Sequence, residues 1–140
     1  MRYILDSSTA FKWVIPEHDS DIALRLRAEF QAAVHELLAP DIFPGEVAHA
    51  LTRAERQARI TPGEALDLWS NVMTTAPQLV PSLPLMHRAI AISSQTLVGV
   101  FDCLYVALAE REGCEFITAD SRAVNGLQRQ FPFVVALSSL

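Results

Sequence analysis

The sequence predicts an α/β fold in which a parallel β-sheet is covered by helices on both faces. Short apolar runs, typical of buried strands, alternate along the 140 residues with longer segments of helical periodicity. A packed core is expected, since 51% of the residues are hydrophobic and 19% are charged. The chain has no repeat, linker or low-complexity segment, so we expect a single domain over residues 1–140.

The first half of the chain is predicted to form two strands and three helices. In order, they are a strand at 2–5, helices at 9–14 and 20–37, a strand at 38–40 and a helix at 44–59. The first strand is aromatic and β-branched and ends at Asp6, and the short helix after it stops near Pro16. Apolar residues recur at helical spacing in 20–37, which makes it the clearest amphipathic helix. Pro44 suits the first turn of the helix that it opens.

The second half continues the alternation. In order, we expect helices at 61–73, 84–97, 101–112 and 121–130, with strands at 78–80, 115–118 and 133–137. Thr61 and Glu64 form a capping box at the first of these helices. Residues 98–100 are a break, and Gly113 terminates the helix that follows it.

The location of the protein is predicted from what the sequence does not contain. No stretch of about 18 apolar residues is present, so we expect no membrane span or membrane partner. The N-terminus reaches Asp6 too soon for a signal peptide, and Cys103 and Cys114 form no Cys-x-x-Cys pair. We therefore expect a cytoplasmic protein.

The net charge of −5 and the sequence pI of about 5.3 are unusual for a nucleic-acid binder, because phosphate contacts need a basic surface. Either the acids are concentrated at a metal site, where the cation reverses their local effect, or the chain does not bind nucleic acid.

Four acids lie where strands end or helices begin. Asp6 follows the first strand, and Asp120 follows the strand at 115–118. Asp102 starts the helix that leads into that strand, and Glu46 lies in the first turn of the helix at 44–59. Ligands of open α/β sheets bind at the carboxyl ends of the strands, so these side chains can converge at one edge.

Carboxylates that share a site repel one another, and a hard divalent cation removes that cost. Mg²⁺ and Mn²⁺ prefer oxygen ligands and activate water for attack on phosphorus. The chain has no Gly-x-Ser-x-Gly motif and no glycine-rich phosphate loop. Taken alone, each acid could instead be a helix cap or complement a helix dipole.

Four segments that contain the acids occur in the order of a known family. They are Tyr3–Ser8, Pro44–Leu51, Phe101–Ala109 and Phe116–Arg122. With residues 10–13 and 16–17, they resemble the PIN-domain ribonucleases, in particular the VapC-type toxins of prokaryotic toxin–antitoxin pairs. The resemblance covers residues 2–137.

The resemblance implies a three-layer α/β/α sandwich and an acidic cluster that binds Mg²⁺ or Mn²⁺ and cleaves RNA. By motif, Asp6 and Asp102 would be the most direct metal ligands. Asp120 would complete the metal shell through water, and Glu46 would hold or activate the hydrolytic water.

The resemblance also assigns Ser8 and Thr118 as hydroxyls that orient the acids. Two departures from the family pattern stand out. Gly45 precedes Glu46, and the segment 97–101 before Asp102 is unusually apolar, which alters substrate access. No acid follows one turn after residue 120, so we expect one tightly bound ion rather than two.

RNA would be held by the basic residues that flank the acids. The candidates are Lys12, Arg53, Arg56 and Arg122. Four of the 16 acids would face the cation, which accounts for part of the negative charge.

The stretches 22–37 and 47–54 are more apolar than a small sheet needs, which indicates protein interfaces. By resemblance, one surface would form a homodimer and another would bind an antitoxin that blocks the acids.

Two alternatives remain. A phosphohydrolase with Asp6 as the nucleophile would usually need a second aspartate two residues on, where this chain has Ser8. A PIN-like scaffold without catalysis would bind only a partner.

Overall fold

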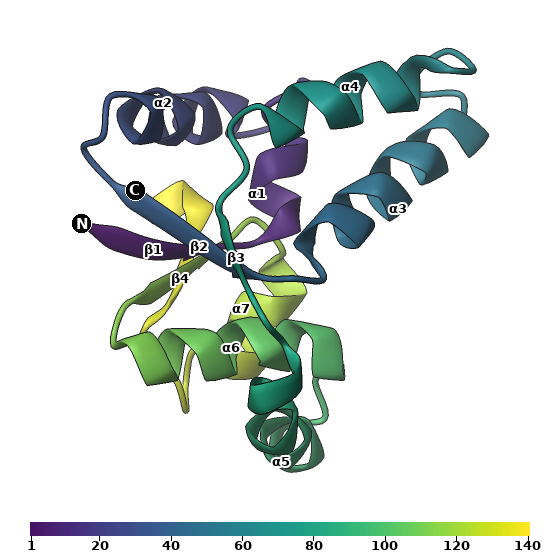
Figure 1. Cartoon of the computed structure of the whole chain (residues 1–140). Helices are drawn as coiled ribbons and strands as arrows, with labels where there is room; N and C mark the ends of the chain where they lie inside the picture. The colour runs from purple at the N-terminus through teal and green to yellow at the C-terminus, as the bar shows by residue number, and fades with distance from the viewer.

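The computed structural model describes residues 1–140 and is built around a five-stranded parallel sheet (Figure 1). The strands lie in the order β3-β2-β1-β4-β5, and every neighbouring pair is parallel. Their bounds are β1 Arg2–Leu5, β2 Glu36–Pro40, β3 Gln78–Val80, β4 Glu115–Thr118 and β5 Val134–Ala136.

Helices cover both faces of this sheet, as predicted. The α-helices are α1 Ser7–Phe11, α2 Ser20–Gln31, α3 Phe43–Arg56, α4 Glu64–Met73, α5 Met86–Thr96, α6 Val100–Glu112 and α7 Ser121–Leu127. Two short 3₁₀ helices are η1 Leu83–Leu85 and η2 Leu137–Ser139. Helices α1 to α4 lie on one face and α5 to α7 on the other (Figure 1). The prediction of an α/β/α sandwich with a central parallel sheet is confirmed.

The strand order reverses between β1 and β4, and this reversal positions the candidate site. The chain runs from β1 outward to β2 and β3, then returns to place β4 and β5 on the other side. Leu5 pairs with Ile117, and the backbone N–H of Asp6 donates to the carbonyl of Ile117 at 3.0 Å. Residues just beyond β1 and β4 therefore meet at a topological switch point, where α/β proteins bind ligands.

Helix α6 is the central helix of the core. All seven residues from Cys103 to Ala109 are buried, since α6 packs between the sheet and α5.

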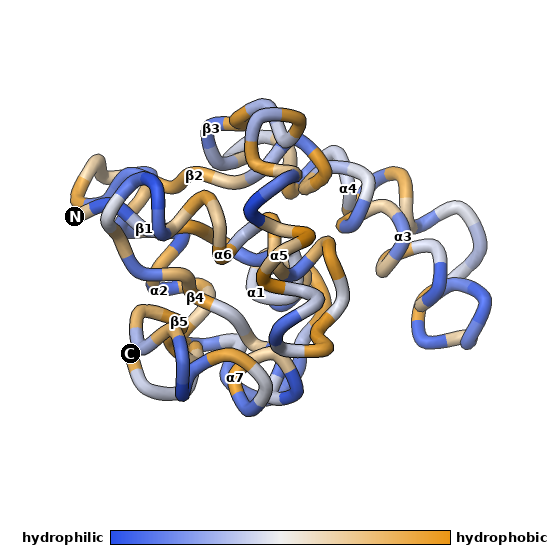
Figure 2. The backbone as a smooth tube through the Cα atoms, turned by 90° about the horizontal axis from the view of Figure 1, so that it is seen from below, coloured by the Kyte–Doolittle hydropathy of each residue, from blue (hydrophilic) through white to orange (hydrophobic).

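No single helix is long and apolar enough to cross a membrane, although Leu83–Thr96 and Val100–Glu112, bent by 117°, meet that test as a pair. The outer end of the α3–α4 hairpin is hydrophilic (Figure 2).

The prediction of one helix over residues 20–37 is wrong at its C-terminal end. Helix α2 ends at Gln31, and Ala33 adopts a left-handed φ of 60° that turns the chain. Glu36 and Leu37 belong to β2, where they pair with Arg2 and Tyr3. Pairing with a distant strand outweighs the local helical periodicity.

Other differences concern boundaries and exposed faces. The helices expected at 9–14, 44–59 and 121–130 occupy Ser7–Phe11, Phe43–Arg56 and Ser121–Leu127, and the last strand ends at Ala136. The apolar residues of 47–54 do not form an exposed face, because Val47, Leu51 and Ala54 are buried. The predicted capping box is only half formed: the N–H of Thr61 donates to Glu64 Oε1 at 3.0 Å, but the helix begins at Glu64 with Gly63 as its N-cap, and no side chain caps it.

The left-handed turn at Ala33 gives a test of this corrected boundary. Ala33→Gly is expected to stabilise the fold by about 0.5 kcal/mol, because glycine adopts positive φ without a Cβ clash. The matched change Ala28→Gly, in the exposed middle of α2, should destabilise it by roughly 0.5–1 kcal/mol. Urea denaturation measures both, and a loss of stability in Ala33→Gly comparable to that in Ala28→Gly would mean that residue 33 is helical.

Candidate active site

Asp6 is the most enclosed of the four predicted acids. It follows β1 and is 4% exposed. The hydroxyls of Ser8 and Thr118 both donate to its Oδ2 atom, at 2.7 Å and 2.6 Å. Burial raises the pKa of Asp6, and the two hydroxyl donors oppose the shift. No side chain donates to the Oδ1 atom, which leaves this oxygen available to a ligand.

The two hydroxyls are themselves fixed by the backbone. Ser8 Oγ accepts the N–H of Ala119 at 3.0 Å, and Thr118 Oγ1 accepts the N–H of Asp120 at 3.1 Å. Each hydroxyl oxygen thus accepts a hydrogen bond from a backbone N–H and donates its own proton to Asp6. The ends of β1 and β4 are joined through this network.

Glu46 projects from the first turn of α3. Its Oε1 atom accepts the hydroxyl of Tyr105 at 2.7 Å and, more weakly, the hydroxyl of Ser7 at 3.5 Å. Burial raises the pKa of Glu46, and the negative charge of Asp6 adds to the shift.

Tyr105, which donates to Glu46, is a site residue that the sequence analysis did not identify. The residue is fully buried and stacks on Phe116 with ring centroids 5.3 Å apart. A signal was present: Tyr105 lies three residues after Asp102 on a helix, and residues at that spacing share a face.

Asp102 lies in the first turn of α6 and is partly buried. No protein group donates a hydrogen bond to its carboxylate, in contrast to the other three acids. Burial raises the pKa of Asp102 to about 7, and the charges of Asp6, Asp120 and Glu46 add to the effect. Gly99 rather than Asp102 occupies the cap position of this helix, so the capping explanation for Asp102 fails.

Asp120 does act as a helix cap. Its Oδ1 atom accepts the N–H of Arg122 at 2.9 Å at the start of α7, and the Arg122 Nε atom lies 3.8 Å away. The Arg122 side chain is 94% exposed, and it is the basic group that lowers the pKa of Asp102. The negative charge of the cluster is therefore compensated only at its outer rim.

The donor set fits a hard divalent cation that keeps part of its water shell. No three acidic, histidine or cysteine side chains lie close enough to enclose an ion. Mg²⁺ usually takes one or two carboxylates and retains several waters, so a closed cage is not required. Asp6 Oδ1 and the carboxylate of Asp102 accept no hydrogen bond from a side chain and could hold it.

Two adjoining grooves reach the acids. One of about 490 Å³ is lined by Ser8, Arg53 and Asp120, among others. A second of about 710 Å³ is lined by residues that include Glu46 and Phe101. Both grooves share Ser7, His49 and Ala50, so an extended ligand can pass from one to the other.

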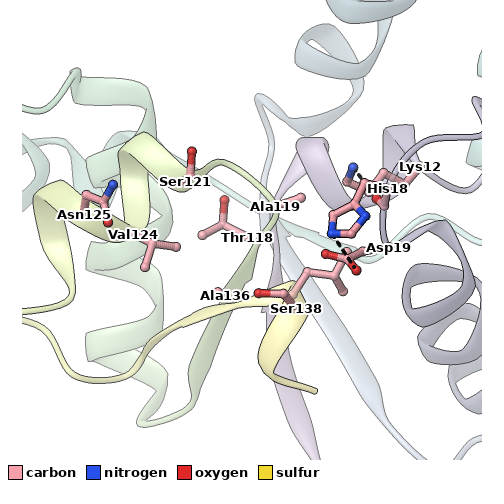
Figure 3. Close-up of a pocket in the computed structure, with 11 residues that line it drawn as sticks. Lys12, His18, Asp19, Thr118, Ala119, Ser121, Val124, Asn125, Ala136 and Ser138 are labelled. Carbon is pink, nitrogen blue, oxygen red and sulfur yellow. Dashed lines mark hydrogen bonds and ion pairs between the residues drawn. The ribbon is translucent and has the colours of Figure 1, made fainter.

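A smaller pocket of about 370 Å³ lies beyond Ala119, at the start of α7 (Figure 3). Lys12 and Ala119 line both this pocket and the groove that contains Asp120. The Lys12 ammonium donates to the carbonyl of His18 at 2.7 Å and lies 3.4 Å from Glu17. The Lys12 ammonium therefore holds this loop, and an RNA contact by Lys12 stays a prediction.

The other predicted basic residues are differently placed. Arg53 is exposed, lines the groove at Asp120 and has no ion-pair partner, while Arg56 is exposed further along α3. The sequence analysis missed Arg59, which lines the same groove, pairs with Glu17 at 2.8 Å and lies over the Phe11 ring.

Comparison with known proteins agrees with this architecture. The family model described as PIN domain matches residues 3–126. Ribonuclease VapC3 from Pyrobaculum aerophilum is 28% identical over 137 residues, which cover 96% of this chain and 98% of that protein. The crystal structure of PAE2754 from Pyrobaculum aerophilum superposes with a TM-score of 0.71 at 16% identity and covers 99% of this chain and 94% of its own. The crystal structure of VapBC2 from Rickettsia felis, bound to a DNA fragment from their promoter, superposes with a TM-score of 0.64 at 12% identity. The match covers 97% of this chain and 97% of that chain.

The raised pKa of Asp102 predicts that the metal-free protein loses stability as the pH rises. An unfolded aspartate ionises near pH 4, whereas Asp102 in the folded protein keeps its proton to about pH 7. The folded state binds more protons in this window, so stability falls between these two values. In EDTA, the melting temperature should therefore change less between pH 5 and pH 8 in Asp102→Asn than in the wild type. At pH 8 the variant should melt roughly 5 °C above the wild type.

Asp67→Asn is the matched control, since Asp67 is exposed on α4 and far from the cluster. It should keep the wild-type pH dependence. An equal pH dependence in Asp102→Asn and the wild type would contradict the assignment of this titration to Asp102.

Proposed function

The chain belongs to the PIN-domain family, and from that premise we propose that it is a divalent-metal-dependent endoribonuclease, the toxin of a VapBC-type toxin–antitoxin pair. The observation that carries the proposal is the cluster of Asp6, Glu46, Asp102 and Asp120 at the topological switch point. Its carboxylates share a partly buried site that contains no internal countercharge.

Asp6 and Asp102 would hold Mg²⁺ or Mn²⁺, with Asp120 completing its surroundings through water. When bound, the cation offsets the carboxylate repulsion, promotes ionisation of water and stabilises charge that develops on the phosphate. Ser8 and Thr118 fix Asp6 so that its Oδ1 atom faces the site.

Glu46 would orient the attacking water and accept its proton. Tyr105 and Ser7 both donate to Oε1, which leaves Oε2 as the oxygen that can accept from water. The raised pKa of Glu46 makes its carboxylate a better proton acceptor than an exposed glutamate. Attack of this water on phosphorus breaks one phosphodiester bond and leaves two shorter RNA strands.

Two adjoining grooves, one reaching Asp120 and the other Glu46, suit a strand that is cut internally rather than at its end. Arg53 on the groove wall and Arg122 at the rim would contact flanking phosphates. The net charge of −5 is compatible with this role, because four of the 16 acids lie at the site itself.

Partner proteins and location follow from the same proposal. An antitoxin would block the acidic cluster with a segment whose positive charge complements it. The structural similarity to VapBC2 supports such a partner. We infer that the toxin acts in the cytoplasm, where its RNA substrates are, and that a second surface forms a homodimer.

The direct test is cleavage of a mixed RNA pool by the purified protein. Cleavage should require Mg²⁺ or Mn²⁺, stop in EDTA, and fall by roughly 10²-fold or more in Asp102→Asn, because one group that stabilises the transition state is lost. Asp67→Asn should cleave like the wild type. Undiminished cleavage by Asp102→Asn would mean that the site is misplaced, and a folded, metal-loaded protein that cuts no RNA would favour a binding scaffold.

A further inference from the structure

Phe101 is exposed in a way that folding does not explain. It is 56% exposed and is the one aromatic residue among the large hydrophobic side chains on the surface. The residues that follow Asp102 on the same helix, Cys103 to Ala109, are all buried. An exposed aromatic ring next to a candidate metal ligand points to a contact with a ligand.

Phe101 lines the largest of the three cavities described above, at about 710 Å³. We refer to this cavity as the Phe101 groove. Glu46 forms part of its wall, so the groove reaches one of the four acids. Gly45 also lines it, and a side chain built at this glycine would meet no protein atom within 4 Å. Gly45 thus borders an open part of this groove.

The lining combines an aromatic surface with polar edges. Ser7 and His49 offer hydrogen-bonding atoms, and Asp41 adds a carboxylate. A flat heterocycle with polar edges matches this combination, since it can stack on the ring and pair at its rim. Double-stranded RNA keeps its bases stacked on one another, so the base must come from an unpaired nucleotide.

We propose that the Phe101 groove binds an unpaired nucleobase of the RNA, adjacent to the scissile phosphate, by stacking it on Phe101. The proposal rests on the proposed ribonuclease function and adds to it a specificity-determining residue. If a phosphate binds at the acids, the base of its own nucleotide or of the next nucleotide lies close to Glu46. Of the two grooves at the acids, the Phe101 groove is the one lined by an exposed phenyl ring.

The test couples a change in the protein to a change in the RNA. Anisotropy measures the Kd of a labelled single-stranded hexanucleotide with Ca²⁺ present, and a parallel series carries one abasic position at a time. For the wild type, loss of the base at one position should weaken binding about 5- to 150-fold, the range expected for stacking of one base. Phe101→Ala should weaken binding of the intact RNA by the same factor, and the abasic change at that position should then have no further effect.

Three further variants separate stacking from other roles. Phe101→Trp keeps an aromatic face and should bind like the wild type, whereas Phe101→Leu should resemble Phe101→Ala. Gly45→Leu should obstruct the groove and also remove the effect of the abasic position, while leaving the core intact. Leu66→Ala, at an exposed apolar residue on α4, is the control and should change nothing.

The outcomes distinguish this proposal from the function on which it rests. Independent, multiplicative effects of Phe101→Ala and the abasic position would overturn the groove assignment even if the wild type cleaves RNA. Coupled effects in binding would support the groove even if cleavage failed. A change in oligomeric state by light scattering in Phe101→Ala, without coupling to any base, would make this surface a protein interface and would contradict the proposal.

Discussion

Four carboxylates meet at the carboxyl edge of the sheet, and their mutual repulsion is the constraint around which the site is built. The reversal of strand order between β1 and β4 brings Asp6 and Asp120 together. Helices α3 and α6 then add Glu46 and Asp102. Burial and neighbouring charges raise the pKa of Asp6, Glu46 and Asp102, so all three favour a proton or a cation. The fold keeps this unfavourable arrangement because the surrounding core holds the acids in place, and hydrogen bonds add to this at Asp6, Glu46 and Asp120.

The supporting contacts leave one side of the site open. Hydroxyl donors act on a single oxygen of Asp6 and a single oxygen of Glu46, while Asp102 has no donor. The free oxygens are therefore left for a cation and for water. Tyr105 connects the site to the core, because its ring packs with Phe116 while its hydroxyl contacts Glu46. Mutations in the centre of α6 would therefore affect the position of an acid as well as stability.

The sequence could predict the sheet, its helical layers and the convergence of four acids at one edge, since these depend on local patterns: apolar runs that stop at an acid, and acids in first helical turns. The metal-binding role of these acids stays a prediction that comes from the resemblance to the PIN-domain family. It could not predict features that depend on distant partners. Residues 36 and 37 continue a helical pattern but pair with β1 instead. The periodicity of apolar residues also does not indicate the left-handed backbone conformation of Ala33. Lys12 was named as a candidate RNA contact, and its contacts with residues 17 and 18 are apparent only in the folded chain. The sequence did not indicate the hydrogen bond from the Tyr105 hydroxyl for the same reason, because its acceptor, Glu46, lies 59 residues away in the sequence.

Calorimetric titration of Mn²⁺ or Mg²⁺ into the metal-free protein, in two buffers of different ionisation enthalpy near pH 6, tests the acidic cluster most directly. The account predicts one cation per chain and a buffer-dependent heat, because cation binding displaces a proton that Asp102 still holds at this pH. Asp6→Asn should abolish binding, since the most direct ligand loses its charge. A buffer-independent heat, or binding that persists unchanged in Asp6→Asn, would contradict the claim that these carboxylates form the metal site.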